Sequence, residues 1–166
     1  IKRGLKVYWT AYTSPGVVDE EMFALYKEAG CDALDFGSDA MSNVGLASMS
    51  KWFTISKIKD ASRWCKENEI KFSHSLIFGS PGETKESIEE TIANVHECDP
   101  SVVIAMIGVR IYLHTPLANR LIKKGWIAQE EIGLTPVFYV EESIREFMFE
   151  RLLTESRNYH NWILPG

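Results

Sequence analysis

The chain has 166 residues, which fits one domain of ordinary size. Hydrophobic residues make up 45% and charged residues 25%, as expected of a globular protein with a single core. The net charge of −5 argues against a nucleic-acid-binding surface, and the longest apolar run, residues 102–109, is too short to span a membrane.

The cysteine content indicates the compartment and excludes two kinds of site. The chain has three cysteines, Cys31, Cys65 and Cys98, at wide spacings that form neither a disulfide framework nor a zinc-binding pattern. We expect all three to pack against helices as small apolar residues. Because the N-terminus also lacks a signal-peptide pattern, we expect a cytoplasmic protein. The chain has no starting Met, so we expect it to be part of a longer protein.

Segments typical of strands and of helices alternate along the chain. Residues 5–13 predict a strand, and residues 19–30 predict a helix with Asp19 as its N-cap and Gly30 as its end. The later predicted elements are a strand at 33–37, helices near 43–50 and 56–68, a strand at 72–79, a helix at 84–98 capped by Thr84, a strand at 101–113, a helix at 116–125, an irregular segment at 126–140 and an amphipathic helix at 141–156.

This alternation predicts an α/β fold with about four parallel strands, joined by right-handed crossovers and followed by a helical tail. The strand at 101–113 is nearly continuous in apolar residues, as in a strand covered on both faces. Two architectures fit the pattern, an open doubly wound sheet and an arc of a barrel. In both, ligands bind at the C-terminal ends of the strands.

The predicted strand ends all carry Gly or Pro beside polar side chains, which favours one shared pocket. Residues 79–84, with the sequence GSPGET, combine two glycines that allow close backbone approach with a helix N-terminus that has unpaired N–H groups. A ribose, a carboxylate or an adenine edge would suit this turn, whereas the Walker pattern for phosphates is absent. A well-capped strand-to-helix turn without a ligand explains the same residues.

Three charged residues near these ends each have a ligand-binding and a structural interpretation. Asp39 could hold a ligand ammonium group or be an ordinary loop acid, and Lys51 stands at a helix end, where lysines are usually solvated. Arg110 interrupts an apolar strand, and a buried guanidinium needs an acceptor. That acceptor could be a ligand carboxylate or an internal Asp.

Four segments in this order resemble the radical S-adenosylmethionine (radical SAM) superfamily. They are AGCDALDFGSDA at 29–40, L-x2-M-x-K-x2-T at 46–54, LIFGSPGET at 76–84 and RIYLHTPLA at 110–118. The resemblance covers residues 5–120. It points to the branch with cobalamin-binding domains and, more distantly, to oxygen-independent coproporphyrinogen oxidases.

By this resemblance the fold is an incomplete (βα)6 barrel, of which this chain supplies the third to sixth strands. Residues 1–125 would form the partial barrel and residues 126–166 a C-terminal helical extension. S-adenosylmethionine would lie across the strand ends. The residues that the resemblance places at its site are Tyr12, Asp39, Lys51, Ser75, Gly79, Pro81, Gly82, Glu83 and Arg110, together with the backbone from Val109 to Ile111.

The C-x3-C-x2-C motif that binds the 4Fe-4S cluster in this superfamily is absent from the chain. The resemblance therefore implies a longer parent enzyme that binds the cluster upstream and acts on a small-molecule substrate. Cobalamin, the cofactor of this branch, would bind to an upstream domain, so the sequence of this chain leaves its use open. The chain alone should be inactive. Its exposed sheet edges should pair with the missing N-terminal half of the barrel or with a second copy.

Two other functions fit the residues without the resemblance. One is a stand-alone α/β domain that binds a nucleotide-like or phosphorylated ligand through GSPGET. The other is a non-catalytic scaffold that docks partners through residues 141–158.

Overall fold

The structure, a computed structural model, describes residues 4–165. A parallel five-stranded sheet has the order β1-β2-β3-β4-β7. Its strands are β1 Trp9–Thr13, β2 Cys31–Asp39, β3 Lys71–Phe78, β4 Val102–Ile107 and β7 Trp162–Ile163. A separate antiparallel pair joins β5 Val109–Arg110 to β6 Phe138–Tyr139.

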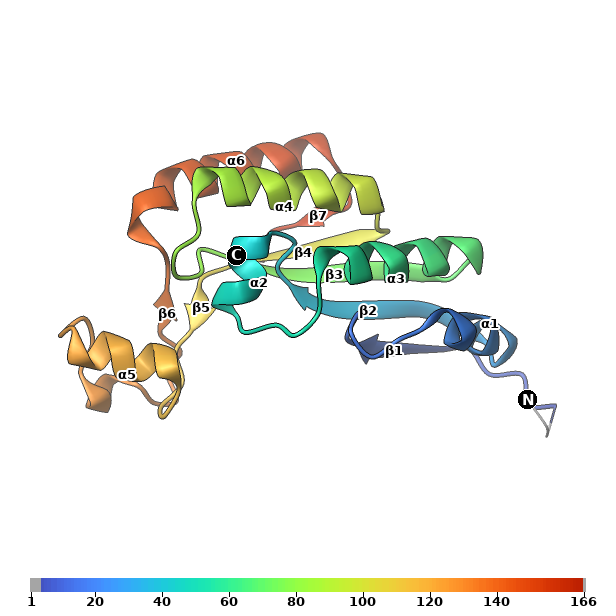
Figure 1. The fold of residues 1–166 in the computed structure, drawn as a ribbon, viewed down its shortest axis with the longest axis horizontal. Coiled ribbons are helices and arrows are strands. Elements are labelled where there is room, and N and C mark those ends of the chain that lie inside the picture. Colours follow the sequence, from blue (N-terminus) through green and yellow to red (C-terminus); the bar gives the residue numbers. More distant parts are fainter. Residues whose placement is uncertain (1–3, 166) are drawn as a thin grey trace.

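The long helices form one layer against the sheet (Figure 1). They are α1 Glu20–Glu28, α3 Ile55–Glu67, α4 Lys85–Cys98 and α6 Arg145–Asn158, and each packs against the next in this order. The short elements are α2 Asn43–Ser48, α5 Pro116–Lys123 and the 3-10 turns η1 Gln129–Glu131 and η2 Glu142–Ile144. Among the residues that the structure describes, no helix is long and apolar enough to cross a membrane.

The strand order decides between the two predicted architectures. Strands β1 to β4 are neighbours in chain order, and the helices between them lie in one layer, so the winding never reverses. A doubly wound sheet requires a reversal and helices on both faces, whereas a barrel is wound in one direction. The fold is therefore an arc of a barrel, which confirms the predicted α/β class and partial barrel.

The fourth predicted strand, 101–113, is wrong as one element. It ends as β4 and resumes as β5, because Gly108 between them has a φ of 87°. Its backbone passes so close to β6 that an added Cβ would lie 3.0 Å from the Cβ of Phe138. The chain thus leaves the main sheet at Gly108 and enters the β5–β6 hairpin.

The strand count and the covering of the sheet also differ from expectation. The predicted helical tail contributes a fifth strand, β7, which pairs with β4 through Val103 and Ile104. Only one face of β4 is covered within residues 4–165, since Val103 and Ala105 are buried while Ile104 and Met106 are half-buried. A strand in a barrel arc is apolar on both faces because its second face lines the interior.

The predicted helix caps are confirmed. The Asp19 carboxylate accepts the N–H of Met22 at 3.2 Å, and Thr84 forms a capping box with Ser87. Gly30 follows α1 with a φ of 88°, a left-handed conformation that glycine adopts without strain. These local signals explain why α1 and α4 begin where the sequence predicts.

Three groups of apolar side chains form the core. The largest packs α4 and α6 on β3 and β4 and includes Met148, Leu152 and Trp162 from the C-terminal part of the chain. A second packs α1 and α3 on β1 and β2, and a third lies beneath α5. The division into a partial barrel at 1–125 and a C-terminal extension at 126–166 stays a prediction. The outermost residues of these two segments, 1–3 and 166, lie outside the described range.

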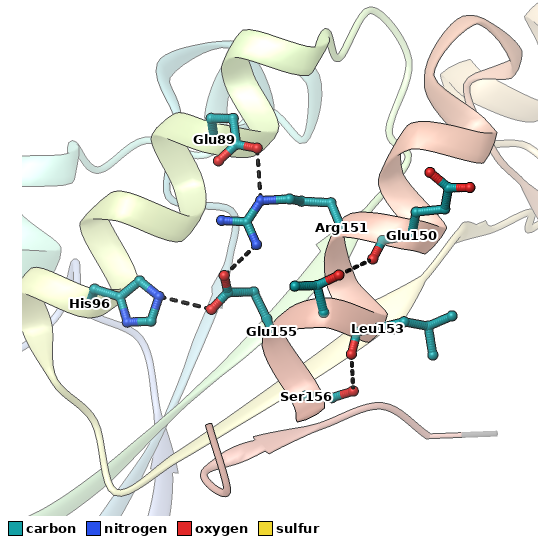
Figure 2. Close-up of polar contacts among 8 residues, drawn as sticks. Glu89, His96, Glu150, Arg151, Leu153, Glu155 and Ser156 are labelled. Atoms are coloured by element: carbon teal, nitrogen blue, oxygen red, sulfur yellow. Dashed lines mark hydrogen bonds and ion pairs between the residues drawn. The ribbon is translucent and has the colours of Figure 1, made fainter. Parts of the chain in front are cut away.

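Two buried polar networks tie helices into this core. His74 on β3 is fully buried, with Nδ1 2.8 Å from the Ser38 hydroxyl and Nε2 3.0 Å from the Ser62 hydroxyl. Between α4 and α6, the buried carboxylate of Glu155 contacts Arg151 and His96 (Figure 2). The first network fixes α3 to β2 and β3, and the second fixes α6 to α4.

Candidate functional site

A cavity of about 540 Å³ lies at the C-terminal ends of β2 and β3, next to β5 and α5. This is the end of the sheet at which the sequence predicts a ligand. The cavity is lined by Asp39, Ser48, Met49, Ile77, Ser80, Pro81, Val109, Pro116, Leu117 and Arg120. Its volume falls in the range of pockets that hold small molecules and cofactors.

Asp39 and Lys51 form an ion pair at the edge of this cavity. Asp39 ends β2 with a φ of 58°, a left-handed conformation that Asp tolerates better than most residues. The side chains of Asp39 and Lys51 are 28% and 23% exposed, so both are partly shielded and still accessible. The pair offers a ligand one acceptor and one donor of opposite charge.

The GSPGET turn forms a second wall through Ser80 and Pro81, while Gly79, Gly82 and Glu83 shape the turn without lining the cavity. Gly79 and Gly82 have φ values of 89° and 80°. A Cβ on Gly79 would lie 3.0 Å from Val140, so the turn needs glycine there both for its conformation and for space. From the end of α2, the Ser48 hydroxyl donates to the carbonyl of Pro81 at 2.8 Å and fixes the turn against α2.

The polar groups of this turn are largely used within the protein. The buried Glu83 carboxylate accepts the N–H groups of Gly79 at 2.7 Å and Ser80 at 2.6 Å, and its burial raises its pKa. The N–H of Gly82 donates to Glu141 at 2.9 Å. The N–H groups of Gly79, Ser80 and Gly82 are therefore occupied, and this part of the turn presents carbonyl oxygens and bare Cα surface to a ligand.

Three other residues named from the sequence lie outside the cavity wall. Ser75 is half-buried on β3, two residues before Ile77 and on the same face of the sheet. Tyr12 on β1 is 86% exposed. Arg110 is exposed and stacks on Tyr112 at 4.8 Å, so its expected burial is wrong, because the break at Gly108 carries it out of the sheet.

The structure adds four polar or adaptable lining residues that the sequence did not single out: Ser48, Met49, Ser80 and Arg120. Ser80 is fully buried, and its hydroxyl has no hydrogen-bond partner among residues 4–165. Met49 and Ser80 lie inside the quoted segments and could have been found there. Arg120 could not, because only the fold of α5 brings it to the strand ends.

The family model described as the radical SAM superfamily matches residues 2–95. The match covers more than half of the 166 residues. The chain belongs to the radical SAM superfamily. This match confirms the resemblance seen in the sequence. Members of this superfamily use S-adenosylmethionine together with a 4Fe-4S cluster.

Individual relatives agree with this assignment. An anaerobic magnesium-protoporphyrin IX monomethyl ester cyclase of Rubrivivax gelatinosus is 31% identical over 166 residues, 96% of this chain and 29% of the cyclase. The radical S-adenosylmethionine methyltransferase TsrM of Kitasatospora setae, solved with cobalamin and a 4Fe-4S cluster bound, superposes with a TM-score of 0.61 at 26% identity, covering 69% of this chain and 21% of TsrM.

The more distant similarity predicted from the sequence is found as well. Coproporphyrinogen III oxidase from Escherichia coli, a radical SAM enzyme, superposes with a TM-score of 0.63 at 16% identity, covering 91% of this chain and 32% of the oxidase. At that identity the likeness concerns the fold alone. The chain spans 28–29% of the length of the first two curated relatives.

The cavity residues fit S-adenosylmethionine. This cofactor carries an ammonium group, a carboxylate and ribose hydroxyls on one side and a flat adenine on the other. The Asp39–Lys51 pair matches the polar groups, while Met49, Val109 and Leu117 provide an apolar wall.

The cysteines do not fit an iron-sulfur cluster. Cys31, Cys65 and Cys98 are all buried, and burial raises the pKa of each thiol, that of Cys65 to about 12. A cluster needs thiolates gathered at one point. Among the described residues, no group of three potential metal ligands occurs.

Proposed function

We propose that this chain forms part of the S-adenosylmethionine- and substrate-binding cavity of a longer radical SAM enzyme, whose cluster ligands lie outside the chain. The observation that carries this proposal is the Asp39–Lys51 ion pair at the mouth of a cavity of about 540 Å³ at the strand ends. Membership of the superfamily supports the cofactor assignment.

Each wall of the cavity has a distinct role in this proposal. The Asp39 carboxylate accepts a hydrogen bond from the cofactor, and Lys51 both orients Asp39 and donates to an acidic group. The turn from Gly79 to Glu83, of which Ser80 and Pro81 line the cavity, would let the cofactor approach the backbone, and the backbone near Val109 would contact the adenine. S-adenosylmethionine supplies the radical chemistry once an electron reaches it, and the protein binds, orients and shields it.

In this proposal, Tyr12 and Ser75, which lie outside the cavity wall, line the interior of the barrel once further strands complete it. Strand β1 is at the edge of the sheet, and its exposed Tyr12 lies on a face that the described residues leave uncovered. The missing barrel strands would pair with this edge and bring Tyr12 and Ser75 to the enclosed interior. A second copy of the chain at the same edge is the alternative partner.

The test uses the protein at its full encoded length, prepared without oxygen. Tritium-labelled S-adenosylmethionine is measured by equilibrium dialysis for the wild type and for Asp39→Asn, and formation of 5′-deoxyadenosine is assayed in parallel. We expect Asp39→Asn to bind about tenfold more weakly, since a hydrogen bond to a charged group contributes about 1.5 kcal/mol.

The matched control is Asp32→Asn. Asp32 is on the same strand, away from the cavity, where it faces Lys71 at 3.6 Å. This variant should bind like the wild type. A wild-type protein without affinity for S-adenosylmethionine would refute the proposal and favour a binding domain for another ligand.

A further inference from the structure

A second cavity, of about 640 Å³, lies on the other side of the GSPGET turn. It shares Pro81 and Arg120 with the first cavity and is otherwise formed by the end of α5 and the segment around β6. The two cavities are therefore adjacent, and Arg120 contributes to both. A molecule in the second cavity would lie next to one in the first.

The wall of the second cavity contains two acidic side chains, Glu141 and Glu142, and both already have partners within the protein. Glu141 accepts the N–H of Gly82 at 2.9 Å and the hydroxyl of Tyr139 at 3.0 Å, and Glu142 pairs with Arg145 at 3.1 Å. Glu142 is thus paired with a cation, while Glu141 has only neutral donors and keeps its negative charge, which the two basic side chains of the wall outnumber.

The two basic side chains in the wall of the second cavity, Arg120 and Lys124, have no acidic partner among the described residues. Within residues 4–165, neither Arg120 nor Lys124 has a carboxylate within 4.0 Å. They stand one turn apart at the end of α5, so both can face one bound molecule. The cavity therefore has positive groups available for an anion.

An aromatic wall completes this cavity. The rings of Trp126 and Tyr139 have centroids 6.0 Å apart and are tilted by 60°. The backbone N–H of Trp126 donates to the carbonyl of Leu121 at 3.0 Å, which fixes the tryptophan directly after α5. Trp126 remains 49% exposed, so its ring offers a free apolar surface beside the two cations.

We infer that the second cavity binds a small planar carboxylate, with Arg120 and Lys124 holding the charge and Trp126 contacting the ring. The further assignment of this ligand as the substrate rests on the proposed function, since the cavity is next to the proposed cofactor site. It identifies the substrate class as an aromatic or similarly flat carboxylate.

The test compares benzoate with benzamide, which has the same shape without the charge. Both are used in radiolabelled form in equilibrium dialysis at low ionic strength, with the protein at its full encoded length. We expect benzoate to bind and benzamide to bind more weakly. Lys124→Gln should weaken benzoate binding about threefold to fivefold, as for one partly exposed ion pair, and Trp126→Leu should weaken both ligands.

Lys123→Gln is the matched control. Lys123 is also exposed in the last turn of α5, where a cation favours the helix C-terminus, but it does not line the cavity. Equal effects of Lys123→Gln and Lys124→Gln, or equal binding of benzoate and benzamide, would overturn the inference.

The same preparations separate this inference from the proposed function. Lys124 lines only the second cavity, so Lys124→Gln should leave the affinity for S-adenosylmethionine unchanged. A wild type that binds S-adenosylmethionine but not benzoate would overturn the inference alone. A wild type that does not bind S-adenosylmethionine would overturn the proposed function and the substrate assignment with it.

Discussion

At the scale of single residues, the site depends on side chains whose partners come from other elements. Asp39 at the end of β2 meets Lys51 from the segment after α2, and Glu83 supports the turn that follows β3. The Asp39–Lys51 contact joins two separate segments, whereas Glu83 accepts the N–H of Gly79 within its own turn. The resemblance to the radical SAM superfamily nevertheless predicted that Asp39 and Lys51 share a site, because it matches both residues to positions that contact S-adenosylmethionine.

His74 provides a residue-scale prediction about pH. Burial lowers the pKa of His74 from 6.5 to about 3. The unfolded chain therefore takes up a proton at higher pH than the folded chain, so the contribution to stability is complete above pH 6.5 and is lost as the pH falls towards 3.

Between pH 7 and pH 5 the free energy of unfolding should therefore fall by about 2 kcal/mol. The fall is about 1.4 kcal/mol for each pH unit below the pKa of the unfolded chain. Urea denaturation at the two pH values measures it. The loss should disappear in His74→Gln and persist in His160→Gln, since His160 is exposed. An equal loss in the wild type and His74→Gln would contradict this explanation.

A second residue-scale prediction concerns Glu155, which is 3% exposed and joins α6 to α4. Its carboxylate contacts His96 at 2.8 Å and also Arg151, which in turn reaches Glu89 at 2.8 Å (Figure 2). Glu155→Ala should reduce the free energy of unfolding by about 3 kcal/mol, because Arg151 loses a buried partner.

Glu150→Ala is the control for this change, because Glu150 is on the same helix, exposed and pointing away from the network in Figure 2. It should change stability by less than about 0.5 kcal/mol. Chemical denaturation gives both values. Similar effects of the two substitutions would show that the network does not fix α6.

At the scale of elements, the sequence predicts helices better than strand ends. Asp19 and Thr84 cap their helices through contacts within one turn, so the signal is local and readable. Strand β7 has two residues, and its place beside β4 is set by how α6 packs. The exposure of Arg110 was missed for a related reason, because it depends on how β6 meets Gly108.

The break at Gly108 gives an element-scale prediction. In Gly108→Ala, the new Cβ would lie 3.0 Å from the Cβ of Phe138 and 3.2 Å from the carbonyl oxygen of Tyr139, with φ at 87°. We expect a loss of about 3 kcal/mol, from about 1–2 kcal/mol of backbone strain and the rest from crowding.

Gly125→Ala isolates the backbone effect, since φ is 68° there and nothing lies within 4 Å of the added Cβ. It should cost only about 1–2 kcal/mol. Thermal unfolding of the two variants measures the difference. Equal losses would mean that the β5–β6 hairpin moves away from Gly108 without cost.

At the scale of the whole molecule, a one-directional winding arranges residues 4–165 as an arc with one helical layer, one face that these residues leave uncovered and β1 at the edge of the sheet (Figure 1). Periodicity alone left the doubly wound sheet and the barrel arc both open, because the same βα alternation builds either. The strand order, which only the three-dimensional structure supplies, distinguishes them. The length of the relatives is consistent with further strands outside this chain.

The central claim is that S-adenosylmethionine binds at the strand ends of this chain. The most direct test is hydrogen–deuterium exchange of the protein at its full encoded length, without oxygen, with and without S-adenosylmethionine. We predict slower exchange in the segments around Asp39, Pro81 and Val109, and unchanged exchange in α6, which is away from the cavity. Protection confined to other segments of the chain, or absent from all of it, would contradict the claim.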